Sequence, residues 1–66
     1  MSSWTPERIK ELREAGYDET QEEFRHRLGV GVEALRFWEQ GKGEPNGSAR
    51  ILLEQLDRSR PKTATA

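Results

Sequence analysis

Few residues in this chain are of the types that catalysis or metal binding needs. It has a single histidine, His26, and no cysteine, so no group of metal ligands or thiol nucleophile is available. No phosphate-binding GxxxxGK[ST] loop, HExxH zinc motif or Ser/His/Asp arrangement occurs. The Gly-x-Gly pairs at 29–31 and 41–43 follow helical patterns, and we interpret them as helix stops rather than as cofactor-binding loops. We therefore expect no enzyme, no cofactor and no metal.

The spacing of residues 20–41 predicts two short helices joined by a tight turn. Thr20 and Glu23 have the spacing of a capping box, and Gly29 is placed to end the first helix. A second helix is expected over 32–40, with Leu35 and Trp38 pointing to one side and Gly41 ending it. A helix, a turn of about three residues containing Gly, and a second helix is the geometry that places one helix in the DNA major groove.

Two further helices complete the pattern. Thr5-Pro6-Glu7 is a strong helix start, and this helix is expected over 6–15, with Gly16 ending it. Residues 17–19 are expected to be a connector. The last helix is capped by Asn46 or Ser48 and runs to Asp57 or Arg58.

The fold class predicted is all-α, with four short helices around one core and a central helix-turn-helix. Trp4 is expected to fold back on the first helix as a staple residue. The core is expected to comprise Ile9, Leu12, Phe24, Leu28, Val30, Ala34, Leu35, Trp38, Leu52, Leu53 and Leu56. Ala49 belongs to the same apolar stripe as Leu52, Leu53 and Leu56.

Length and charge limit the remaining choices. With 66 residues the chain has room for one domain, expected over 1–58, and a disordered tail is expected over 59–66. No apolar run is long enough for a membrane span and no signal-peptide pattern begins the chain, so a cytoplasmic protein is expected. The net charge is -1, which predicts weak binding to non-specific DNA.

These segments together resemble the Cro and phage-repressor helix-turn-helix family, also called the xenobiotic-response-element family, and most of all its compact antitoxin-like and regulator-like members. The resemblance covers roughly fifty residues and rests on TPERIKELR (5–13), TQEEFRHRLGV (20–30), FWEQG (37–41) and EPNGSARILL (44–53). It implies a lambda-repressor-like fold, double-stranded DNA as the partner and a homodimer as the active species.

The resemblance also implies roles for particular positions. Gln21 resembles a glutamine that hydrogen-bonds a phosphate, and Arg13 and Glu39 resemble a salt-bridged pair. Lys42 and Gly43 match a loop that touches the DNA backbone. The side of the recognition helix that faces the groove would hold Val32, Glu33, Arg36, Phe37 and Gln40.

The chain departs from the family pattern at three places. Gly31 replaces the usual serine or threonine cap of the recognition helix and so lacks a phosphate-binding hydroxyl. Val32, Glu33 and Phe37 stand where polar base-reading residues are common. The connector between the first two helices is also one residue longer than usual.

Several of these side chains have more than one interpretation. Glu33 can accept a hydrogen bond from cytosine N4, or it can be a first-turn acid favoured by the helix dipole. Phe37 and Val32 can contact thymine methyl groups, whereas Phe37 can also mark a protein contact. Arg36 is the best donor on this helix to a base or a phosphate. Alternatively, it is a solvated side chain that pairs with Glu33 or Glu39. Ile51 lies on a dimer face or on a partly covered flank.

The sequence thus leads to a first hypothesis and to alternatives. The first is a sequence-specific DNA-binding regulator, a repressor that occupies its promoter as a dimer. The second is a helix-turn-helix scaffold that binds a protein through Phe37, Val32 and Trp4. The third is the antitoxin of a toxin–antitoxin pair, which adds a protein ligand.

Overall fold

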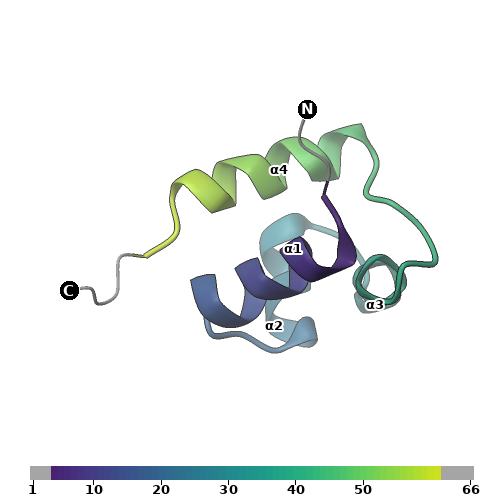
Figure 1. Cartoon of the computed structure of the whole chain (residues 1–66), viewed down its shortest axis with the longest axis horizontal. Helices are drawn as coiled ribbons and strands as arrows, with labels where there is room; N and C mark the ends of the chain where they lie inside the picture. The colour runs from purple at the N-terminus through teal and green to yellow at the C-terminus, as the bar shows by residue number, and fades with distance from the viewer. Residues whose placement is uncertain (1–3, 62–66) are drawn as a thin grey trace.

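The computed structural model describes residues 4–61, and within that range the chain folds into helices and connectors without a β-strand. The elements are α1 (Pro6–Glu11), the π-helical turn η1 (Leu12–Gly16), α2 (Gln21–Leu28), α3 (Val32–Gln40) and α4 (Gly47–Arg58). Because η1 continues α1 directly, the four predicted helices are present and the all-α class is confirmed. Figure 1 shows α4 along one side of the molecule, with α1 and α2 on its inner side and α3 at one end.

The helices begin where the sequence supplies caps. The Thr5 hydroxyl accepts a hydrogen bond from the Arg8 amide at 3.2 Å. Thr20 and Glu23 form the full capping box that starts α2. Of the two caps considered for α4, Asn46 is the one used, because its side chain accepts from the Ala49 amide at 2.9 Å.

Glycines end α2 and α3 by the same local geometry. Gly29 has a φ of 67° and Gly41 a φ of 79°, in the left-handed region that other residues adopt only with strain. After Gly29 the Val30 amide donates to the Arg25 carbonyl at 3.2 Å, and after Gly41 the Lys42 amide donates to the Phe37 carbonyl at 2.9 Å. These are Schellman motifs, and they fix both ends of the helix-turn-helix.

The end of the first helix differs from the expected regular α-helix over 6–15. Its last turn is the π-helical η1, which reaches Gly16. A π turn accommodates an additional residue, consistent with the expectation that the connector is one residue longer than usual. Arg13 holds the turn closed, because its carbonyl accepts from the Glu19 amide at 3.1 Å and its Nη1 donates to the Glu19 carbonyl at 3.0 Å.

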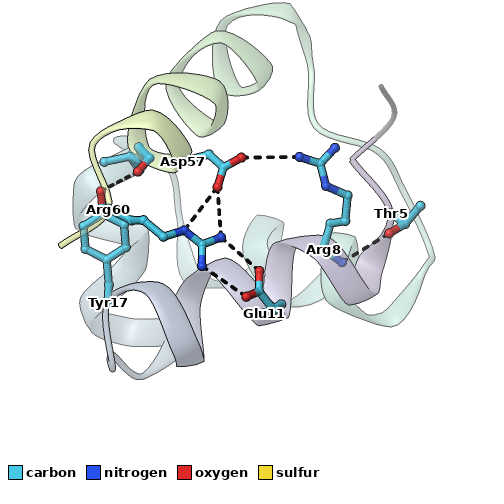
Figure 2. A network of polar contacts seen from close by, with 7 residues as sticks. Thr5, Arg8, Glu11, Tyr17, Asp57 and Arg60 are labelled. Atoms are coloured by element: carbon cyan, nitrogen blue, oxygen red, sulfur yellow. Dashed lines mark hydrogen bonds and ion pairs between the residues drawn. The ribbon is translucent and has the colours of Figure 1, made fainter. Parts of the chain in front are cut away.

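The core largely matches the expected set. Its buried members are Trp4, Ile9, Leu12, Phe24, Leu28, Leu35, Trp38, Ala49 and Leu53, while Val30, Ala34, Leu52 and Leu56 are partly buried against it. Tyr17 lies in the connector, as expected, and its side chain is also partly buried against the core. Its ring packs 6.0 Å from that of Phe24, and its hydroxyl donates to the Leu56 carbonyl at 2.6 Å. A dashed line from the Tyr17 hydroxyl marks this hydrogen bond in Figure 2. A hydroxyl that reaches a carbonyl 39 residues away along the chain leaves no local pattern.

The end of α4 is attached to α1 by ion pairs (Figure 2). The Arg60 guanidinium donates to both oxygens of Glu11, at 3.1 and 3.0 Å, and to Asp57 at 2.9 Å. Asp57 also lies 3.5 Å from the Arg8 guanidinium. Arg60 belongs to the segment 59–66 expected to be a disordered tail, and it packs against α1; residues 62–66 lie outside the described residues.

Candidate nucleic-acid interface

The helix α3 has a clear inner and outer side. Leu35, Trp38 and Glu39 are buried and root it in the molecule. Among the positions expected to face a groove, Val32 is half-buried, and the exposed ones are Glu33, Arg36, Phe37 and Gln40. This exposed side is about one helix face wide, because positions 33, 36, 37 and 40 recur at helical spacing. We call it the α3 outer face.

The N-terminal end of α3 is open. Gly31 occupies the cap position with an extended backbone, and no side chain caps the helix there. A Cβ built on Gly31 would meet no atom within 4 Å. The first amides of α3 therefore have no side-chain acceptor, and their donors and the positive end of the helix dipole face outward.

Arg13 and Glu39 form the expected salt bridge, and both residues are only 8% exposed. The guanidinium binds the carboxylate through two hydrogen bonds, Nε to Oε2 and Nη2 to Oε1, each 2.8 Å long. These hydrogen bonds raise the pKa of Arg13. The pair joins η1 to the C-terminal end of α3, so the recognition helix is tied to the first helix by charge as well as by packing.

Gln21 joins the same network. Its side-chain amide donates to Glu39 Oε1 at 3.1 Å, so the residue expected to contact a phosphate also orients the buried carboxylate. An amide group has two donor hydrogens, so one remains for a second acceptor. The Gln21 side chain is half-buried at the start of α2, beside the C-terminal end of α3. Nothing in the sequence signals the contact with Glu39.

Phe37 and Lys42 meet across the Gly41 turn. Phe37 is 52% exposed, and the Lys42 ammonium lies 5.9 Å from its ring centroid. At this distance a cation–π attraction is weak but favourable. Gly43 follows in an exposed loop with open space around its Cα, so its backbone can approach a partner closely. The contact places a cation at the C-terminal end of the α3 outer face.

Acidic residues neutralise most of the cations elsewhere on the molecule. Arg27 lies 2.7 Å from Glu19, and its hydrogen bonds lower the pKa of that carboxyl. Arg25 pairs in the same way with Glu22. Within residues 4–61 the cations without an ion pair are Lys10, Arg36, Lys42, Arg50 and Arg58. Two of them, Arg36 and Lys42, therefore belong to α3 and the loop that follows it.

Most of the expected site residues thus fall into four groups. Gln21 meets the Arg13–Glu39 pair at one end of α3, and Phe37 meets Lys42. Gly31 and Val32 lie at the opposite end of the helix. Glu33, Arg36 and Gln40 make no side-chain hydrogen bond or ion pair within residues 4–61, so they are available to a partner. Their spacing predicted an outward position, whereas the sequence left open an ion pair of Arg36 with Glu33 or Glu39.

The described residues contain no group of three or more His, Cys, Asp or Glu that could hold a metal ion. None of the helices in the described range is long and apolar enough to span a membrane.

Comparisons with protein-family models, curated proteins and solved structures gave no match.

Proposed function

We propose that this protein is a sequence-specific DNA-binding regulator, a repressor of the Cro and phage-repressor type, that reads the major groove with α3. The observation that carries the proposal is the α3 outer face. It presents the unpaired Arg36 and the amide of Gln40 to solvent, while Leu35, Trp38 and Glu39 hold the helix from behind. A rigidly held helix with free hydrogen-bonding side chains is what direct readout of base edges needs.

The surroundings of α3 support the same proposal. Gln21 at the start of α2 and Lys42 after α3 both lie near the C-terminal end of α3, and phosphates border a groove-bound helix. The open amides behind Gly31 add donors of the kind that bind phosphate oxygens. Phosphate contacts would set the position of the helix, and its side chains would select the sequence.

Within this proposal each residue has a stated task. Arg36 donates to guanine O6 and N7 or to a phosphate, and Gln40 pairs with adenine. Glu33 accepts from cytosine N4, and Phe37 packs on a thymine methyl group. The protein acts as a homodimer on a palindromic operator with half-sites about 34 Å apart, and it represses by occupying a promoter.

Three observations favour a second candidate function, binding of a protein through the same face. Phe37 is a large exposed hydrophobe, and Glu33 would repel phosphates. The chain's net charge of -1 also gives little general attraction to nucleic acid. On this reading α3 and Lys42 form an apolar contact patch with a charged rim.

NMR shift mapping distinguishes the two functions. The protein is titrated with a random duplex at low salt, and then with duplexes selected by the protein from a random pool. DNA binding predicts shifts concentrated at residues 31–43 that vanish when salt is added to the random duplex. Arg36→Ala should abolish the preference for the selected sequence, while Lys10→Ala, a cation change on α1, should leave it intact. Absence of any response in wild type would exclude DNA and favour the protein partner.

A further inference from the structure

The side of α4 that faces away from the core is shaped and charged for a contact. Ala49 and Leu53 are buried on the inner side. The outer side forms a shallow groove of about 460 Å³, which we call the α4 groove, lined by Gly47, Arg50, Ile51, Glu54, Gln55 and Arg58. Ile51 is 61% exposed, whereas the leucines of α4 are buried or partly buried. In Figure 1 no other helix lies on the side of α4 opposite to α1 and α2.

The charges in the α4 groove have no partners in the monomer. Arg50 and Glu54 are one turn apart, yet they form no ion pair with each other or with any other group within residues 4–61. This contrasts with Asp57 on the neighbouring side of α4, which binds both Arg8 and Arg60. This exposed face carries a cation and an anion that each lack a partner. It would be complementary to a surface that presents an anion and a cation in the reverse order.

We propose that the α4 groove binds a second copy of this chain, with the two α4 helices antiparallel about a two-fold axis level with Leu52. In that register residue 50 of one copy lies level with residue 54 of the other. Arg50 and Glu54 are about 40° apart around the helix, on one flank, and antiparallel pairing brings the same flanks of two helices together. Each Arg50 thus meets Glu54 of the second copy, and the bridge forms twice.

The apolar part of the groove fits the same register. The two Ile51 side chains lie beside the axis, where they cover one another. Gly47 has no side chain, and a Cβ there would meet nothing within 4 Å, so the stem of Arg58 from the second copy can lie over it. An isologous contact requires a face complementary to itself, and the order Arg50, Ile51, Glu54 meets that requirement.

The size of the surface sets the strength of the contact. A 12-residue helix is about 18 Å long, and one such face buries less than the roughly 800 Å² per partner of a standard interface. The dimer is therefore weak, and it dissociates at roughly micromolar concentration and at high salt. The inference concerns α4 alone and stands whether α3 binds DNA or a protein.

Charge reversal and mixing test the register. Sedimentation velocity at low salt is measured over a range of concentrations, and circular dichroism melts check that each variant folds. Arg50→Glu and Glu54→Arg should each abolish self-association, because like charges then oppose across the axis. An equimolar mixture of these two variants should associate again, since each copy now supplies the charges that the other lacks. Lys10→Glu makes the same charge change on α1 and should associate as wild type does.

The outcomes separate cleanly. Loss of self-association in both single variants, with recovery of association on mixing them, supports the proposed pairing. A wild-type protein that stays monomeric up to roughly 1 mM overturns the proposal, as does unaltered dimerisation of Arg50→Glu. Loss of self-association in both variants, without association of their mixture, overturns the antiparallel register. Wild-type shifts at Arg50 and Arg58 on adding duplex, with no self-association, would assign the groove to nucleic acid instead.

Discussion

Arg13 and Glu39 are 26 positions apart in the chain and share two hydrogen bonds of 2.8 Å beneath the surface of the protein. The pair closes the space between the first helix and the end of α3. Gln21 adds a third member from α2. One buried carboxylate on α3 therefore receives donors from two other helical elements, η1 and α2, and these contacts join the three elements.

Removing one partner of this pair should be costly, because the other charge is then left buried without compensation. Glu39→Gln and Arg13→Ala are each expected to lower the free energy of unfolding by about 3 kcal/mol, measured by urea denaturation at neutral pH. The double variant Arg13→Met/Glu39→Leu should lose less than the two single losses added together. Single losses below about 0.5 kcal/mol would show that the pair contributes little to stability.

Gly31→Ser should stabilise the protein. The position has a φ of -76° and open space, so serine fits there and can cap α3. We expect a gain of about 0.5 kcal/mol, or roughly 2–4 °C in Tm for a domain of this size.

Gly29→Ser is the matched control for this change, two residues away in equally open space but with a φ of 67°. It should destabilise the protein by about 1 kcal/mol because serine is strained in the left-handed region. Equal effects at the two glycines would contradict this account of the turn.

The attachment of Arg60 to α1 should make stability depend on pH. Hydrogen bonds from Arg60 lower the pKa of Glu11 from its ordinary value of 4.5. A lowered carboxyl pKa stabilises the folded state above about pH 4.5, and this contribution is lost as the pH falls through the folded-state pKa. Arg60→Gln should therefore lower the free energy of unfolding more at neutral pH than in acid.

Both side chains are partly exposed to solvent, so screening limits the expected difference to about 0.5 kcal/mol. It is measured by urea denaturation at neutral pH and well below pH 4.5. Arg36→Gln, the same substitution at a residue without an ion pair within residues 4–61, should show no such difference. A cost for Arg60→Gln that does not change with pH would rule out the ion pair as its cause.

Lys42→Ala should weaken binding to all DNA sequences to a similar extent. Lys42 is proposed to contact phosphate, so its loss should reduce the slope of log K against log salt by about one unit. The measurement is fluorescence anisotropy of labelled duplexes, selected and random, over a series of salt concentrations. A selective loss on the chosen operator alone would instead place Lys42 at a base.

Local signals in the sequence predicted the helices well. Thr5, Thr20 and Asn46 cap their own helices within three residues, and Gly29 and Gly41 end theirs, so each boundary is decided by neighbours in the chain. The outward position of Arg36 and Gln40 followed from helical spacing against Leu35 and Trp38. These features needed no knowledge of tertiary structure.

The remaining features depend on contacts between distant segments. The π turn at Leu12–Gly16 is held by Arg13 across the connector, and the burial of Tyr17 depends on α4. Arg60 stands in a polar segment whose composition indicates disorder, yet Glu11 lies within its reach because the fold brings the end of α4 beside α1. The link from Gln21 to Glu39 is of the same kind.

The ion pairs that hold this protein together also shape how it meets other molecules. Since Arg13, Arg25, Arg27 and Arg60 are each within hydrogen-bonding distance of an acid, their fields cancel within a few ångströms. Little potential then extends beyond the Debye length of about 10 Å. We therefore expect any partner to be met by ordinary diffusion, without long-range attraction, and to be selected only after the two surfaces touch.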